Sequence, residues 1–403
     1  MFSNVKPYAG DPIYTLFENF QKDVRQNKVS LSVGVYCDED GNIPYMEAVR
    51  VAESRISQNF GSRSYLPMEG MGVYRSMVQG FLFGDGSEAN QSERISTIQT
   101  VGATGALRIG ADFLSHSLNC RDVWVSDYTW ETHCDIFAAA GYRVHRYPFY
   151  DFATGGVKFD AMYGLLSSLS KDSVVVLHAS AHNPTGAELS EGQWRELSKL
   201  AKEKGLIFFL DMAYQGFSKS VEEDAIAIRT LIDFEVGFLL ANSFSKNFSM
   251  YGERVGSLSV VCPNSLQAEK VTGQLKATVR QSYSSPPTHG ARVISSILGD
   301  GVLKELWLTE LDSMKNRIQS MRYSLYERLL PYADPDQIKY LLRQSGMFSF
   351  TGLSTQQIDW LKNERGIYLV GSGRICIAGL TTKNIDYVAE SLGHILSHNS
   401  KKN

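Results

Sequence analysis

A lysine, an arginine and two serines stand together just beyond an apolar run near the middle of the chain. The run Phe238 to Ala241 is typical of a buried strand in a parallel sheet. It is followed by Ser243, Ser245, Lys246 and Arg254. A lysine beyond a buried strand loses part of its hydration, which favours the neutral, nucleophilic amine. Serine hydroxyls and an arginine bind phosphate well, although Lys246 alone would be read as a surface lysine.

Four other strand-like runs are also followed by polar or aromatic groups. In chain order these groups are Gly102, Ala103 and Thr104 after 95–100, Trp130 after 122–126, Asn183 after 173–178, and Asp211 with Tyr214 at the end of 206–211. The N–H groups of a helix that opens at Gly102 could hold a phosphate, and a tryptophan face can stack on a ring. Singly, such a glycine is often turn chemistry and such a tryptophan is often core. Ligands of open α/β sheets bind beyond the carboxyl ends of the strands, so we expect all these groups at one edge.

The combined set predicts a site for pyridoxal phosphate. A lysine can form a Schiff base with the cofactor, and a buried aspartate can keep the pyridine nitrogen protonated so that the ring accepts electrons. An aspartate that follows Phe208, Phe209 and Leu210 needs such a cationic or N–H partner.

The elements that must position these groups alternate regularly from residue 95 onward. Strand-like runs at 95–100, 122–126, 142–147, 173–178, 206–211 and 236–243 are separated by helical stretches, which predicts parallel crossovers in a three-layer α/β domain. The next strand, 255–262, follows too closely for a helical crossover, so we expect it to be antiparallel. Helix 15–27 and strand 29–36 are also expected, and residues 1–12 resemble an extended arm.

A long helix with one apolar stripe is predicted from the spacing of Trp307, Leu311, Met314, Ile318, Met321 and Leu325. Short strands at 347–351 and 375–378 and a closing helix follow it. We therefore expect an arm at 1–12, a smaller α+β domain at 13–44 and 315–403, and a large cofactor-binding domain at 45–314.

Composition excludes several other classes of protein. The chain is 43% hydrophobic and 21% charged, and its net charge of -3 offers no basic field for nucleic acid or an acidic membrane surface. No apolar run approaches the roughly 18 residues of a membrane span, and no export signal opens the sequence. Five scattered cysteines without a CxxC pair fit a cytoplasmic protein, and without an HExxH motif no metal is expected.

The motifs together resemble those of the class I aspartate and aromatic aminotransferases, a family of fold type I pyridoxal-phosphate enzymes. The resemblance runs essentially end to end, through Tyr8–Ile13, Tyr65–Gly70, His182–Gly186, Asp211–Phe217, Ser243–Lys246, Tyr251–Gly256 and Ser372–Arg374. It implies a mostly parallel sheet with one antiparallel strand, and a homodimer whose two active sites are composite. The implied reaction moves an amino group between an amino acid and a 2-oxo acid.

The resemblance also implies a role for each matching residue. Lys246 is the Schiff-base lysine and proton carrier. Asp211 pairs with the pyridine nitrogen, and His133 orients Asp211. The cofactor's 3-oxygen is bound by Tyr214 and Asn183, and Trp130 stacks on the ring. The phosphate is held by Gly102, Ala103, Thr104, Ser243, Arg254 and, from the other subunit, Tyr65. The substrate is bound by Gly34, Trp130, Asn183, Arg374 at its α-carboxylate and, across the dimer, Arg280 at its side chain.

Without the resemblance, Arg280 and Arg374 would both be read as solvated surface arginines. Two positions depart from the family pattern, because Ala103 replaces a glycine before Thr104, and Tyr128 replaces a proline before Trp130. Neither change threatens the chemistry.

Substrate preference is the harder question. Ile43 and Ser285 resemble the aromatic branch, Val35 and Thr104 resemble the aspartate branch, and Cys37 matches neither. We expect an enzyme that acts on tyrosine, phenylalanine and tryptophan and also on aspartate and glutamate, with a strict aspartate aminotransferase as the alternative.

Two other classes remain as remote alternatives. Ser243-x-x-Lys246 matches the Ser–Lys pattern of some acyl hydrolases, but Ser168-x-x-Lys171 matches it equally well and no KTG or SDN motif is present. A non-catalytic nucleotide-binding module would need no lysine at the strand end.

Overall fold

The computed structural model describes residues 2–8, 10–58, 61–62 and 64–399. The chain divides into a large unit, residues 44–183 and 187–316, and a small unit, residues 1–43, 184–186 and 317–403. The domain ranges expected from the sequence include residues 1, 9, 59–60, 63 and 400–403, which lie outside the described residues. Each unit is described by itself.

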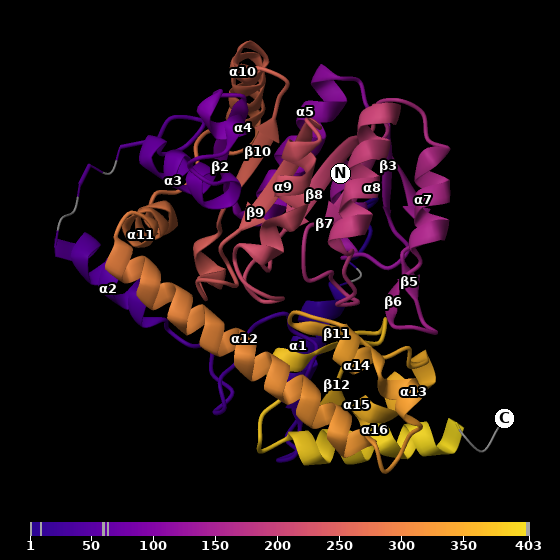
Figure 1. Ribbon diagram of the computed structural model, residues 1–403. Coiled ribbons are helices and arrows are strands. Elements are labelled where there is room, and N and C mark those ends of the chain that lie inside the picture. The colour runs from indigo at the N-terminus through magenta and orange to yellow at the C-terminus, as the bar shows by residue number, and fades with distance from the viewer. Residues whose placement is uncertain (1, 9, 59–60, 63, 400–403) are drawn as a thin grey trace. The chain divides into compact units, whose positions relative to one another are not determined.

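The large unit is built on a seven-stranded sheet (Figure 1). Its strands, in spatial order, are β2 (Ile95–Val101), β10 (Val255–Val261), β9 (Phe238–Ser243), β8 (Ile207–Met212), β7 (Val174–His178), β3 (Asp122–Ser126) and β4 (Arg143–Tyr147). All neighbouring pairs are parallel except those of β10, which is antiparallel to both β2 and β9. The expected α/β sheet with one antiparallel strand is therefore confirmed.

Helices cover both faces of this sheet. One face carries α5 (Gly102–Ser117) and α6 (Thr132–Ala139), which contact each other, and α5 packs on β2, β8, β9 and β10. The other face carries α7 (Phe159–Ser167), α8 (Glu191–Lys204) and α9 (Ile226–Asp233), which pack in sequence (Figure 1). This division follows from right-handed crossovers, because the chain moves across the sheet one way through α5 and α6 and the other way through α7 to α9.

The strands read as continuous apolar runs because helices bury both of their faces. Phe208, Phe209, Leu239, Leu240 and Leu258 are almost completely buried at the centre of the sheet. Other elements of the large unit are α2 (Glu47–Gln58), α3 (Gly72–Phe83), α4 (Glu88–Gln91), β5 (Tyr150–Asp151), β6 (Gly156–Val157), α10 (Ser265–Ser282) and α11 (His289–Leu298). The core thus holds the carboxyl ends of β3, β7, β8 and β9 at one edge.

The small unit combines short strands with peripheral helices, as an α+β domain does. Strand β1 (Val29–Ser30) pairs in parallel with β12 (Ile367–Tyr368), and β11 (Phe348–Phe350) pairs antiparallel with β13 (Arg374–Cys376). Its helices are α1 (Pro12–Lys22), α13 (Pro335–Ile338), α14 (Tyr340–Arg343), α15 (Thr355–Arg365) and α16 (Ile385–Asn399).

Two sequence-based expectations for the N-terminal part were wrong in their bounds. The helix begins at Pro12 rather than residue 15, because the Asp11 side chain accepts hydrogen bonds from the N–H groups of Ile13 and Tyr14. The strand expected at 29–36 pairs only at Val29 and Ser30. Residues 2–8 and 10–11 form no helix or strand, and Phe2, Val5 and Tyr8 are exposed.

The long helix predicted from the apolar stripe is α12 (Gly301–Leu329), drawn in orange in Figure 1. All six stripe residues, from Trp307 to Leu325, are buried. The division between the two units falls between Asn316 and Arg317, within this helix. Among the described residues, no helix is long and apolar enough to cross a membrane.

Candidate active site

A buried row of polar groups lies beside the carboxyl end of β8. β8 was expected to end at Asp211 but continues for one residue, to Met212, so Asp211 is its penultimate residue. Asp211 Oδ2 lies 3.0 Å from His133 Nε2 at the start of α6. The other ring nitrogen of His133 lies 2.8 Å from the Thr129 hydroxyl. All three side chains are buried. The histidine is therefore held at both nitrogens and in turn fixes the carboxylate.

The Asp211 carboxylate keeps one oxygen for a further partner. Burial alone would raise its pKa, but the hydrogen bond from His133 and the positive charge of Lys246 lower the pKa of Asp211 below its ordinary value. Its Oδ1 is buried and has no hydrogen-bond partner among the described residues. A buried, charged oxygen without a donor is costly, so it fits a ligand that brings an N–H group.

A second histidine lies next to this carboxylate. His178 ends β7 and stands in register with Asp211 on β8. The ligand atoms of His133, His178 and Asp211 lie within 4.8 Å of one another, which is the geometry of a candidate metal site. Burial lowers the pKa of His178 well below its ordinary value, so His178 is neutral. Since Asp211 Oδ1 suits a pyridinium N–H, a metal and the cofactor would compete for the same carboxylate.

Lys246 follows β9 and faces an aromatic ring. Its Nζ lies 4.9 Å from the centre of the Tyr214 ring, and the Tyr214 hydroxyl lies 3.5 Å from Asn183 Nδ2. Tyr214 and Asn183 are buried, and Lys246 is partly exposed. The structure thus brings together the lysine, the phenol and the amide that the sequence placed at three different strand ends.

The residues expected to form a phosphate cradle lie around the start of α5. The first N–H groups of this helix, from Gly102 onward, have no intrahelical acceptor and point out of its N-terminus. The Arg254 guanidinium lies against Gly102, since a Cβ added there would stand 2.8 Å from Arg254 Nη2. Thr104 is exposed and Ala103 is buried.

The other side of the cradle comes from the segment after β9. Arg254 Nη1 donates to the Ser245 hydroxyl at 3.2 Å, and the Ser243 hydroxyl donates to Ser245 at 3.1 Å. A Cβ added at Gly256 would stand 2.7 Å from the Gly102 carbonyl carbon, so β10 passes tightly beneath the helix start. A positive charge, hydroxyls and free N–H groups therefore converge at one point, as anion binding requires.

Trp130 and His133 lie near each other at the end of β3. Their ring centres are 5.4 Å apart and nearly perpendicular. Trp130 is partly exposed, which leaves part of its face available to a bound ring.

Two residues expected from the partner subunit are exposed in the single chain. Tyr65 is 96% exposed. Arg280, near the end of α10, is also exposed, and among the described residues its guanidinium donates only to the Ser284 hydroxyl. Both lie in the large unit.

Arg374 and Gly34 belong to the small unit. Arg374 is buried, Nη2 donates to the Ser32 carbonyl at 2.6 Å, and the guanidinium lies 4.4 Å from the centre of the Phe348 ring. Gly34 is partly buried in the segment that follows β1. Reading Arg374 as a surface arginine would have been wrong.

Sequence reasoning missed Thr129, His178 and the buried Asp224. Thr129 stands four residues before His133, and His178 is the last residue of its strand, so both carried a positional signal. Asp224 lies in the acidic run Glu222–Asp224, which gives no signal of burial.

The side chains at this site suit the chemical groups of pyridoxal phosphate. The unpartnered Asp211 Oδ1 suits a protonated pyridine nitrogen, and the cradle of α5 with Arg254 suits a phosphate. The Lys246 amine and the Tyr214 phenol lie in the same unit as Asp211 and the N-terminus of α5.

Comparisons with known proteins point in the same direction. The family model for aminotransferase class I and II matches residues 26–392. The chain is 49% identical over 397 residues to the aromatic-amino-acid aminotransferase of Escherichia coli, covering 98% of this chain and 100% of that protein. It is 43% identical over 396 residues to an aspartate aminotransferase of Pseudomonas aeruginosa, covering 98% and 100%.

A solved structure is similar over almost its full length. The aromatic-amino-acid aminotransferase from Burkholderia pseudomallei, covalently bound to pyridoxal phosphate, matches with a TM-score of 0.95 and 43% identity. The match covers 98% of this chain and 99% of that one.

Proposed function

Because the chain belongs to the aminotransferase class I and II family, we propose that it transfers amino groups from aromatic amino acids and from aspartate and glutamate to 2-oxoglutarate. The aromatic substrates are tyrosine, phenylalanine and tryptophan, and the reaction follows the ping-pong scheme of the family. The range is supported by relatives of both kinds, with the aromatic one at 49% identity and the aspartate one at 43%.

Pyridoxal phosphate, when bound, supplies an electron sink for the pair left on the substrate Cα. The residues that would hold it are Asp211 with His133 at the pyridine nitrogen, Tyr214 and Asn183 at the 3-oxygen, Trp130 on the ring face, and Gly102, Ala103, Thr104, Ser243, Arg254 and the partner subunit's Tyr65 at the phosphate. The single observation that carries this proposal is the buried, unpartnered Oδ1 of Asp211 in the same unit as Lys246.

The chain's own side chains then perform three tasks. Lys246 Nζ takes up the proton from the substrate Cα and gives it back later in the cycle. Asp211 stays charged because His133 stabilises its carboxylate. Arg374 binds the α-carboxylate that every amino acid substrate carries, and Gly34, Trp130 and Asn183 line the rest of the substrate site.

We further propose a homodimer with composite active sites, in which Arg280 reads the side-chain carboxylate of a substrate bound to the other subunit. The exposure of Tyr65, Arg280 and the apolar arm residues Phe2, Val5 and Tyr8 supports a covering partner. A cytoplasmic location is supported by the five free cysteines, Cys37, Cys120, Cys134, Cys262 and Cys376.

The Lys246→Ala variant tests the proposed chemistry. It should still bind the cofactor but lose transamination by several orders of magnitude, because nucleophile and proton carrier are removed together. Stopped-flow absorbance with tyrosine and with aspartate measures both half-reactions. The matched control is Lys199→Ala on the exposed face of α8, which should keep full activity. Near-normal turnover of Lys246→Ala would contradict the assignment.

Composite sites are tested by complementation. A Lys246→Ala chain and an Arg280→Ala chain, each poorly active with aspartate, should regain activity when refolded together, because one site of each heterodimer is intact. No recovery in a preparation that contains heterodimers would exclude a shared site.

A strict aspartate aminotransferase is the alternative that the 43% identical relative favours. A panel of tyrosine, phenylalanine, tryptophan and aspartate with 2-oxoglutarate separates the two functions. Turnover of aspartate alone would select the alternative.

A further inference from the structure

The turn that follows Tyr214 is wrapped around the carboxylate of Asp224. Asp224 Oδ2 accepts hydrogen bonds from the N–H groups of Gly216 at 2.8 Å and Ser218 at 3.2 Å, and Oδ1 accepts one from Lys219 at 3.0 Å. The backbone N–H of Asp224 itself donates to the Ser220 carbonyl at 2.9 Å. Three of the backbone donors in this turn therefore depend on one side chain.

The same turn begins at Tyr214. The N–H of Phe217 donates to the Tyr214 carbonyl at 3.1 Å, so the residues held by Asp224 are one hydrogen bond away from the backbone of Tyr214. Gly216 has a φ of 91°, and a Cβ there would stand 2.5 Å from a Leu311 methyl group, so the turn is also packed tightly on its outer side. Because Leu311 closes the outer side of the turn and the Phe217 N–H is bonded to the Tyr214 carbonyl, a shift of the turn would be passed to Tyr214.

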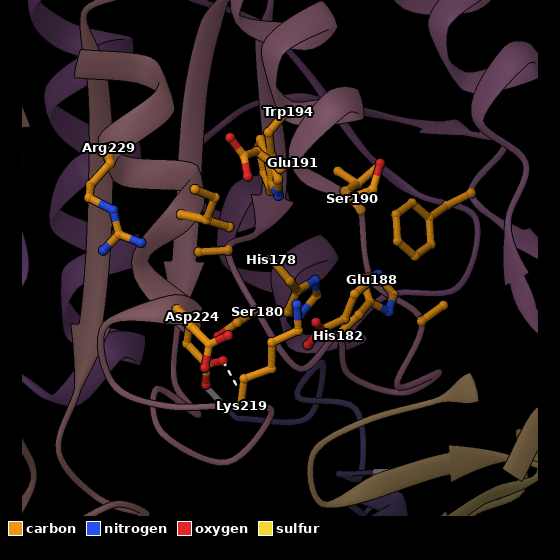
Figure 2. Close-up of a pocket in the computed structure, with 16 residues that line it drawn as sticks. His178, Ser180, His182, Glu188, Ser190, Glu191, Trp194, Lys219, Asp224 and Arg229 are labelled. Carbon is orange, nitrogen blue, oxygen red and sulfur yellow. Dashed lines mark hydrogen bonds between the residues drawn. The ribbon is translucent and has the colours of Figure 1, made fainter. Parts of the chain in front are cut away.

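Asp224 borders a pocket of about 250 Å³ in the large unit (Figure 2). The picture shows Asp224 and Lys219 at one end of the pocket, with His178, Ser180, His182 and Glu188 nearby and Glu191, Trp194 and Arg229 further away. The ionisable groups that line it besides Asp224 are His178, His182, Glu188, Glu191, Lys219, Glu223 and Arg229. Protons can therefore reach a side chain that is otherwise buried.

Burial, and then the negative charge of Glu188, raise the pKa of Asp224 to about 7, although the three N–H groups act in the opposite direction. Because the folded pKa lies above the ordinary value, the stability that this group contributes is complete below about pH 4 and is lost as the pH rises through about 7. The local effect on the turn has the opposite sign, because a charged carboxylate is the stronger acceptor for the three N–H groups.

We infer that Asp224 is a positioning residue of the active site, whose charged carboxylate fixes the turn that sets the place of the Tyr214 hydroxyl. The inference rests on the role proposed for Tyr214 at the cofactor's 3-oxygen. It adds a second, remote carboxylate to the site, and it makes the position of Tyr214 depend on pH near neutrality.

The test compares Asp224→Asn in two backgrounds of the cofactor-loaded enzyme. Tyr214 should favour the deprotonated form of the bound chromophore, so Tyr214→Phe should raise the pH midpoint of its absorbance change. Asp224→Asn should raise that midpoint by about half a pH unit or more, because the Tyr214 hydroxyl, which donates to the chromophore, is displaced. In the Tyr214→Phe background Asp224→Asn should add no further shift. The matched control is Glu223→Gln, which removes a charge at the next residue along but no bond to the turn.

Three results would overturn the inference, and they can be told apart. A shift with Tyr214→Phe but none with Asp224→Asn leaves the role of Tyr214 intact and excludes Asp224. No shift with either variant contradicts both. An equal Asp224→Asn shift in both backgrounds means that Asp224 does not act through Tyr214.

A measurement on the unmodified enzyme covers the case in which Asp224→Asn does not fold. Amide exchange at Gly216, Ser218 and Lys219, corrected for intrinsic rates, should slow as the pH rises through about 7. The N–H of Ala179, which donates to the Asp211 carbonyl, should show no such change. Protection of the three amides that does not vary with pH would exclude the proposed control by charge.

Discussion

The two arginines proposed to bind substrate are held in opposite ways. Arg374 in the small unit is buried, donates to the Ser32 carbonyl at 2.6 Å and lies over the Phe348 ring. Arg280 in the large unit is exposed near the end of α10 and donates a hydrogen bond to the Ser284 hydroxyl. One guanidinium is fixed before any substrate arrives, and the other is not.

This difference matches what each arginine would have to recognise. Every amino acid carries an α-carboxylate, so a fixed partner for it loses little entropy on binding. Only some substrates carry a second carboxylate. A buried, unpaired guanidinium beneath an aromatic ring would cost several kcal/mol, so a site that accepts both kinds needs an arginine that can move aside.

The two binding modes are of similar strength, which makes dual specificity possible. A desolvated bidentate ion pair contributes a few kcal/mol. Burying roughly 150 Å² of an aromatic ring at about 25 cal/mol per Å² contributes about 4 kcal/mol. A movable Arg280 can therefore serve both kinds of substrate without a strong bias.

The largest expected effect is that of Arg374→Ala. It should lower kcat/KM by about three powers of ten for tyrosine and aspartate alike, because both lose the same bidentate partner. Steady-state kinetics with both substrates measure it, and a thermal melt controls for folding. Arg374→Lys keeps the charge but not the planar fork, and should recover only part of the loss. A loss confined to one substrate would mean that Arg374 does not read the shared carboxylate.

A smaller and selective effect is expected of Arg280→Ala. It should lower kcat/KM for aspartate by about two powers of ten, since a charged pair is lost, and should change the value for phenylalanine far less. Half-reactions followed separately for each amino acid give the two values. The exposed Arg195 on α8 offers a control, because Arg195→Ala should leave both unchanged. Equal losses for the two substrates would make Arg280 a structural residue and remove the contrast with Arg374.

The smallest effect should come from Ser284→Ala, which removes the contact of Arg280. Without this hydrogen bond, which contributes about 1 kcal/mol, Arg280 can move aside more easily. The value of kcat/KM should therefore rise a few-fold for phenylalanine and less for aspartate. Ser284 has a φ of 68°, a conformation that glycine adopts without strain. Ser284→Gly therefore removes the hydroxyl and the backbone strain together, and its comparison with Ser284→Ala separates the effect of the hydroxyl from that of the strain. A larger gain for aspartate would show that Ser284 holds Arg280 away from substrate.

Much of the fold could be predicted because the sheet is buried on both faces. The apolar runs for β2, β3, β7, β8 and β9 agree with the strands to within two residues, and the short connection before β10 predicted its antiparallel direction. Asp211 and Lys246 could be placed because a charged side chain at the end of such a run stands out.

Features that depend on contacts distant in sequence could not be predicted. The burial of Arg374 comes from Ser32 and Phe348, neither of which is near it in the chain. Asp224 reads as the last residue of an exposed acidic run, and only the folded turn brings three N–H groups to it. The strand expected at 29–36 was too long because β12 offers only two residues to pair with.

The discontinuity of the small unit has a consequence for how such a chain can change over generations. Its residues come from three separate stretches, 1–43, 184–186 and 317–403, and the last boundary falls inside α12. No single crossover between two genes can replace this unit as a whole, and a break at residue 316 would join halves of α12 that come from two different genes. An exchange of residues 317–403 would move Arg374 and Phe348 without Ser32, whose carbonyl holds the Arg374 guanidinium. The large unit's Arg280 and Ser284, in contrast, lie in one short segment that recombination can exchange intact.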